Sequence, residues 1–95
     1  MSDIQNIIIQ AISAHLVVNL NYKGSWRTVE PHLLGVNKKG NICLSAFQLS
    51  GGSGSSWRAF LVASIEQAVL SEVHFELRYG YNPNDNTMDT IIIAA

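Results

Sequence analysis

Two of the three arginines of this sequence, Arg27 and Arg58, carry guanidinium groups that could hold a negatively charged ligand. A guanidinium group presents a planar fork of N–H donors that matches the oxygens of a phosphate or a carboxylate. The same fork would also pair with a nearby carboxylate, such as that of Glu30 or Glu66, on a solvated surface. Both interpretations stay open at this point, and the residue types alone favour ordinary ion pairs.

Three aromatic residues lie close to these arginines in the sequence. Trp57 directly precedes Arg58, and Tyr22 and Phe47 belong to neighbouring motifs. An aromatic ring beside a cationic group is a stacking surface for a nucleic-acid base, worth ~1–3 kcal/mol per base. In so short a chain, aromatic rings more often build the core. Trp57 is therefore the best candidate for stacking, ahead of Tyr22 and Phe47.

Potential metal ligands are few and widely spaced: His15, His32, Cys43 and His74. No pair among them has the short spacing that marks a zinc site, so no metal is expected. His32, which follows Pro31, is a candidate to donate a hydrogen bond to an anionic ligand. A structural histidine, with its ring bonded inside the fold, is the more common alternative.

No arrangement of residues predicts catalysis. The order of a Ser/His/Asp nucleophile elbow is missing, and no closely spaced carboxylate pair suggests acid and base work. The segment Ser50–Ser56 (SGGSGSS) has glycines but neither the Lys-Ser/Thr of a phosphate-binding loop nor a helix pattern after it. We therefore expect a non-enzymatic protein without a cofactor, and a flexible hairpin loop at residues 50–56.

The composition describes one small folded domain over residues 1–95. Hydrophobic residues make up 47% of the 95-residue chain and charged residues 14%, which is enough for one core in a chain too short for two domains. Six Lys and Arg residues oppose seven Asp and Glu residues, and the net charge is -1. Such a charge gives no global field for nucleic acid or an anionic membrane, so any site for a polyanion must be a local patch.

The sequence predicts a cytoplasmic protein that does not enter a membrane. The single Cys43 cannot form an intramolecular disulfide, and the first residues lack the basic segment of a signal peptide. Apolar runs such as residues 7–9 and 91–95 are far shorter than the roughly 18 residues that span a bilayer.

The hydrophobic pattern predicts one amphipathic helix at the start of the chain. Five apolar residues recur at helical spacing: Ile4, Ile7, Ile8, Ala11 and Ile12. Ser2 and Gln5 have the spacing of a capping box, so the helix should begin at residue 2 or 3. Ile9 lies off the apolar face, which favours a wider buried stripe over a partner surface.

Short strands are expected wherever apolar residues alternate with polar ones. Their predicted ranges are 16–22, 26–30, 42–49, 57–63, 67–70, 73–79 and 90–95. Turns are expected at Gly24-Ser25 and at residues 38–41, and Pro31 indicates an edge, a bulge or a strand end because it lacks an N–H donor. One helix and six or seven short strands predict a mainly β fold, built as a strongly bent antiparallel sheet or a small barrel.

Five short motifs follow one another in an order that is more specific than any one of them. They are Ala11-Ile12, Leu20-Asn21-Tyr22, residues 27–32 (RTVEPH), residues 44–47 (LSAF) and residues 57–60 (WRAF). This order resembles the WYL domain, an SH3-like or Sm-like β-barrel common in bacterial regulators, over residues 4–72. Residues 73–95 then form a C-terminal strand extension. Of the family's Trp-Tyr-Leu triplet, Ile42-Cys43-Leu44 keeps only the leucine, and Leu61 and Val62 stand where further basic residues often follow.

The resemblance implies a stand-alone regulatory or sensory module, because 95 residues leave no room for the DNA-reading winged helix that usually precedes a WYL domain. It implies binding of single-stranded nucleic acid, or of a nucleotide-like or other anionic ligand, without catalysis. The expected ligand-binding residues are Tyr22, Arg27, His32, Phe47, Trp57 and Arg58. The competing hypothesis is a structural adaptor that binds a protein partner through the helix, the C-terminal isoleucines and the strand edges. Open edges also predict a homodimer.

Overall fold

The computed structural model describes residues 3–52 and 54–95. Helix α1 spans Asp3–Ala14, and a single 3-10 turn, η1, spans Val62–Ser64. The strands are β1 (Leu16–Tyr22), β2 (Ser25–Asn37), β3 (Ile42–Ser50), β4 (Ser56–Leu61), β5 (Ile65–His74) and β6 (Met88–Ala94). The mainly β fold with one N-terminal helix is confirmed, and the helix begins within the predicted range. Ser2 of the predicted capping box lies outside the described residues.

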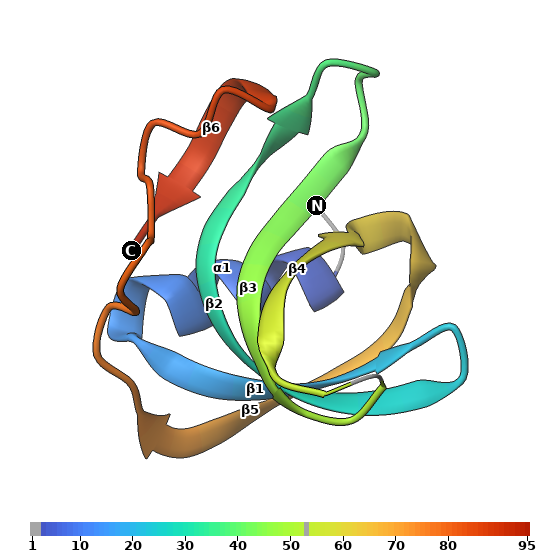
Figure 1. The fold of residues 1–95 in the computed structure, drawn as a ribbon. Coiled ribbons are helices and arrows are strands. Elements are labelled where there is room, and N and C mark those ends of the chain that lie inside the picture. The colour runs from blue at the N-terminus through green and yellow to red at the C-terminus, as the bar shows by residue number, and fades with distance from the viewer. Residues whose placement is uncertain (1–2, 53) are drawn as a thin grey trace.

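Strand β2 is the central strand of one antiparallel sheet with the order β4-β3-β2-β1-β5, and β6 also pairs with it. One edge of β2 pairs with β3 along most of its length. The other edge pairs first with β1, over residues 25–29, and then with β6, over residues 33–37. Figure 1 shows β2 and β3 as long curved strands in front of α1. The sheet is strongly bent, as predicted, but it is not closed, because β4 and β5 form the two ends of the order.

A β-bulge in the middle of β2 confirms one of the three meanings predicted for Pro31. Pro31 pairs with Ala46 and Leu33 with Ser45, so His32 is an extra residue without a partner on β3. A bulge bends its strand and redirects the side chain of the extra residue. Here it lets β2 turn from β1 toward β6 and places His32 in the interior.

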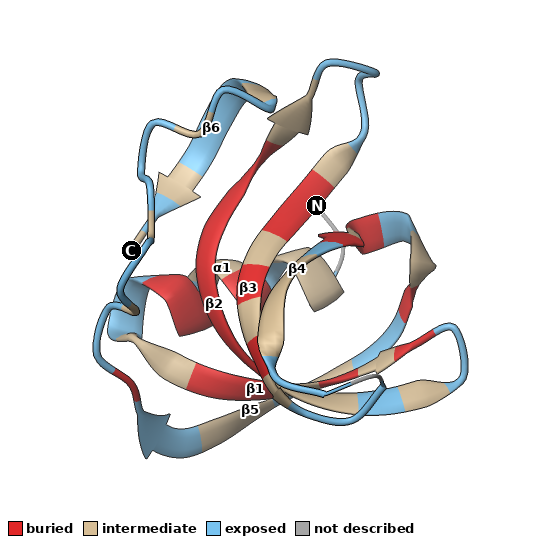
Figure 2. Ribbon diagram, viewed as in Figure 1, coloured by how far each residue is buried: buried red, intermediate tan, exposed pale blue. Residues whose placement is uncertain are grey.

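The sheet has two faces that matter for the site. The inner face, which carries Val29, Leu44 and Phe60, packs against α1 to form the main core. Ile9 also packs against this core, so the wider apolar stripe of the helix is confirmed. The outer face is the opposite side of β2, β3 and β4, where Glu30 pairs with Phe47 and Phe47 with Trp57. Figure 2 shows buried residues along the middle of β2 and β3 and mostly exposed residues in β6.

The predicted strands at residues 67–70 and 73–79 are wrong in their boundaries. One strand, β5, runs continuously from Ile65 to His74, and residues 75–87 form an irregular segment that leads to β6. We call residues 75–87 the crossing segment. Phe75, Arg78 and Tyr81 contact residues of the outer face, so tertiary contacts replace the ladder that their alternation predicted.

No helix among the described residues is long and apolar enough to cross a membrane.

Candidate ligand-binding site

The six predicted ligand-binding residues divide into two groups on opposite faces of the sheet. Arg58 pairs with Ala46 of the core, and Arg27 pairs with Leu20 of the core, so both arginines point to the inner face with Tyr22. Three other residues, His32, Phe47 and Trp57, belong to the outer face. Neighbouring residues of a strand point to opposite faces, which separates Trp57 from Arg58.

The inner-face group is centred on the guanidinium of Arg27. Its Cζ atom lies 5.4 Å from the centroid of the Tyr22 ring and 5.8 Å from that of Phe60. Nη1 donates a hydrogen bond to Gln48 Oε1 at 3.3 Å, while no acceptor among the described residues meets the buried Nε. Two aromatic rings therefore hold a cation whose hydrogen-bonding capacity is only partly used.

Lys23 adds a second cation at the same ring. Its Nζ lies 5.4 Å from the Tyr22 centroid, the same distance as Arg27 Cζ. Within the described part of the chain, the ion pairs join Lys38 to Asp89 and Arg78 to Glu30, and neither Lys23 nor Arg27 takes part in one. The carboxylate of Glu66 instead accepts a hydrogen bond from the backbone of Gly24 at 2.8 Å. The rim of the inner face around Tyr22 thus carries two cations against one nearby carboxylate, which makes it a local positive patch.

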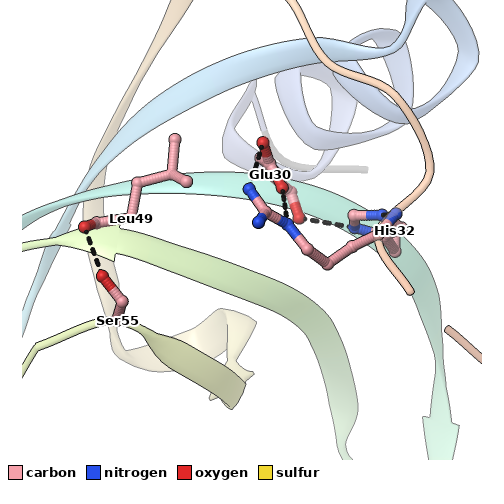
Figure 3. A network of polar contacts seen from close by, with 5 residues as sticks. Glu30, His32, Leu49 and Ser55 are labelled. Atoms are coloured by element: carbon pink, nitrogen blue, oxygen red, sulfur yellow. Dashed lines mark hydrogen bonds and ion pairs between the residues drawn. The ribbon is translucent and has the colours of Figure 1, made fainter. Parts of the chain in front are cut away.

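Gln48 fastens the glycine-rich loop beside this patch. Its side chain is fully buried, and Nε2 donates to the carbonyl oxygens of Gly51 and Gly54 at 2.7 Å each. Ser55 Oγ also donates to the Leu49 carbonyl at 3.0 Å, as Figure 3 shows. The predicted hairpin loop between β3 and β4 is present, and its described residues are tied to β3 next to Arg27.

The outer-face group surrounds His32, which is fully buried. Its ring centroid lies 4.9 Å from those of Trp57, Phe75 and Tyr81. Nδ1 lies 2.8 Å from the Glu30 carbonyl oxygen, a contact visible in Figure 3, and Nε2 accepts a hydrogen bond from the backbone of Arg78 at 3.0 Å. Because a carbonyl only accepts and an amide only donates, the proton of the neutral ring is on Nδ1.

Burial favours the neutral form of His32. Burial lowers the pKa of His32 below its usual value, and the opposing interactions with Glu30 are smaller. A proton on Nε2 would also face the N–H donor of Arg78. Both ring nitrogens are engaged inside the chain, an arrangement that fits the structural alternative for this residue.

Arg78 fixes the crossing segment to the outer face. Its Nε and Nη2 donate to the two carboxylate oxygens of Glu30 at 2.9 and 3.1 Å, and these bonds raise the pKa of Arg78. The guanidinium carbon lies 4.2 Å from the centroid of Phe47. A carboxylate and an aromatic ring thus hold a planar cation on this face.

Among the residues of these networks that were not predicted as ligand-binding residues are Gln48, Arg78 and Tyr81. The sequence could have indicated Gln48, because it continues the core-facing alternation of Leu44 and Ala46. A polar residue at such a position needs buried hydrogen-bond partners. No pattern in the sequence could have indicated Arg78 or Tyr81, since these residues contact His32 from 46 and 49 positions away.

The described residues contain no group of three or more His, Cys, Asp and Glu side chains that could hold a metal ion. Cys43 is a buried free thiol, and burial raises its pKa, with a smaller contribution from the charge of Asp85. This favours the protonated, unreactive form. Comparisons with protein-family models, with curated proteins and with solved structures each found no match.

Proposed function

We propose that the chain is a non-catalytic regulatory module, a stand-alone WYL-like domain of the SH3-like or Sm-like type, that binds a phosphate-bearing ligand at the rim of its inner face, around Tyr22. The ligand is a nucleotide or a single strand of nucleic acid. One observation carries this proposal: Lys23 and Arg27 lie at the same Tyr22 ring, and neither has a carboxylate partner among the described residues. Cations of this kind are suited to phosphate oxygens.

The fate of the competing carboxylates supports the proposal. Ion pairs to Glu30 or Glu66 were the alternative role for the arginines, yet Glu30 binds Arg78 on the outer face, and no ion pair among the described residues joins Arg27 to Glu66. Arg58 points to the same face as Arg27 and lies in β4, directly after the glycine-rich loop. The rim of the inner face therefore offers Lys23 and Arg27 to a bound phosphate group, and Arg58, which points to the same face, is the third cation that we propose a bound strand contacts.

The salt dependence of binding tests this proposal. Three phosphate contacts to a single strand predict a slope of log K against log salt of about -2, at about -0.7 per contact. The assay is fluorescence anisotropy of a short labelled oligothymidylate at several salt concentrations, with a nucleoside triphosphate as competitor. Lys23→Gln and Arg27→Gln should each weaken binding and make the slope shallower by about 0.7.

Lys39→Gln is the matched control, because Lys39 is an exposed cation in the turn between β2 and β3. It removes the same charge as Lys23→Gln without touching the patch. Binding by neither the strand nor the nucleotide at low salt would overturn the proposal. Equal losses of affinity for Lys39→Gln and Lys23→Gln would also overturn it, because they would show that only the net charge of the protein matters.

A protein partner is the second candidate, because the side of the molecule formed by β5 and the crossing segment exposes large apolar residues: Val69, Val73, Leu77 and Tyr79. The exposed fraction rises to 99% for Tyr79. Large apolar side chains that stay exposed in consecutive segments are typical of interaction surfaces. If the oligonucleotide and the nucleotide both fail to bind, this surface becomes the leading hypothesis.

A further inference from the structure

The outer face contains a cavity that the proposed phosphate site does not use. Its volume is about 190 Å³, and it is lined by Ser45, Trp57, Gly80, Tyr81, Asn82 and Asp85. The lining comes from β3, β4 and the crossing segment, so the cavity exists only because that segment packs against the sheet. A space of this size accommodates a small head group rather than a whole nucleotide.

Two aromatic rings form one part of the lining. The centroids of Trp57 and Tyr81 lie 6.4 Å apart, with the ring planes at 22°. Tyr81 is held in place through its hydroxyl, which donates toward the carbonyl oxygens of His32 and Ala95 at 3.2 and 3.3 Å. Trp57 is held by its contacts with His32 and Phe47. The rings are therefore positioned before any ligand arrives, which lowers the entropic cost of binding.

Asp85 supplies the one carboxyl group of these lining residues. Its Oδ1 atom accepts hydrogen bonds from the backbone and the hydroxyl of Thr87, at 2.9 and 2.7 Å. Neither bond uses Oδ2, and no donor among the described residues meets that atom. A carboxylate with an open oxygen beside two π-systems repels anions and attracts cations.

Elsewhere on the outer face, a carboxylate and an aromatic ring already hold a cation. Phe47 and the Glu30 carboxylate hold the guanidinium of Arg78, with the cation 4.2 Å from the ring centroid. In the cavity, Trp57 and Tyr81 take the place of Phe47, and Asp85 takes the place of Glu30. No lysine or arginine is among the described residues that line it. We propose that this cavity binds a small organic cation, a methylated ammonium or guanidinium group, between the Trp57–Tyr81 pair and Asp85.

Tryptophan fluorescence tests the proposal. The chain has two tryptophans, and Trp26 is about half exposed, so Trp26→Phe leaves Trp57 as the only reporter. In that background, choline and N-methylguanidinium at constant ionic strength should give saturable changes. The neutral tert-butyl analogue of choline should bind about tenfold more weakly or not at all. A short peptide carrying trimethyllysine, compared with its unmodified form, shows whether the cation is presented free or on a side chain.

The charge of Asp85 is tested by Asp85→Asn, which keeps the Oδ1 acceptor for Thr87 and should weaken binding of both cations about tenfold. Asp89→Asn is the matched control, because Asp89 is exposed and its carboxylate pairs with Lys38 outside the cavity. Amide NMR spectra, read at the Trp57 indole N–H and at Gly80, give a second readout. Equal binding of the neutral analogue would overturn the proposal, as would an Asp85→Asn variant that binds like the parent. The phosphate site lies on the other face, so this result is independent of the proposed function.

Discussion

Acid should destabilise the protein through His32, and the structure gives the sign of the effect. Burial lowers the pKa of His32, so the unfolded chain takes up a proton near the usual value of 6.5 while the folded chain does so only at lower pH. Between these two pKa values the unfolded state binds more protons than the folded state, so the free energy of unfolding decreases as the pH falls. One such group changes the free energy of unfolding by at most about 1.4 kcal/mol per pH unit. Stability is therefore fully present above pH 6.5 and is lost below it.

His32→Gln isolates this effect. At pH 8 the variant should be less stable than the parent by about 1–3 kcal/mol, because the buried bonds to Glu30 and Arg78 are lost or weakened. The difference should shrink as the pH falls from 7 toward 5, since only the parent loses the His32 contribution. The assay is urea unfolding monitored by tryptophan fluorescence at a series of pH values.

His74→Gln, which changes an exposed histidine at the end of β5, is the matched control, and the His32 effect is the part that exceeds it. If His32→Gln does not fold, an NMR titration of the parent ring answers the same question and reports whether the proton sits on Nδ1. A stability difference that stays constant from pH 8 to pH 5, or a His32 ring that titrates at or above 6.5, would refute the reasoning.

Two further predictions concern the loop and the last strand. In urea unfolding, Gly51→Ala should lower the free energy of unfolding clearly more than Gly40→Ala. Both glycines have a positive φ, which costs about 1–2 kcal/mol for alanine. Only the new Cβ at Gly51 would also clash with the Trp26 carbonyl oxygen, because the space around Gly40 is open. Equal costs would show that the loop does not rest on β2. Removing residues 90–95 should lower the melting temperature, by about 4–8 °C for each 1 kcal/mol lost, because it removes most of the β2–β6 ladder and the bond from Ala95 to His32. An unchanged melting temperature would contradict this. Light scattering over a range of concentrations checks the predicted homodimer, and a constant monomer mass would exclude it.

Local patterns in the sequence predicted most of the helix and strands, because these depend on neighbours within a few positions. The alternation after His15 gives β1 correctly, and the missing N–H of Pro31 indicates the bulge in β2. The same logic failed at residues 73–79, where alternation predicted a separate strand. Phe75 and Arg78 are instead held by His32 and Glu30, which lie more than 40 residues earlier. No period in the local sequence encodes such contacts.

The candidate site shows the same division between local and distant information. Strand alternation alone places the side chains of Trp57 and Arg58 on opposite faces of the sheet. The prediction that both belong to one site, which rested on the order of the motifs, therefore conflicted with the two-residue period of the predicted strand. That Arg27 and Arg58 share a face depends on the register of β2 against β3 and of β3 against β4, which the sequence does not reveal.

Strand β4 therefore contributes one residue to each proposed site, Arg58 to the phosphate site and Trp57 to the cation cavity. Two substitutions at adjacent positions should then have opposite consequences. Arg58→Gln should weaken oligonucleotide binding and make its salt slope shallower by about 0.7, while leaving choline binding intact. Trp57→Leu should weaken choline binding and leave the oligonucleotide slope unchanged, because the tryptophan side chain neutralises no phosphate. If both variants impaired both ligands equally, the two faces would act as one site, and the separation argued from the register would be wrong.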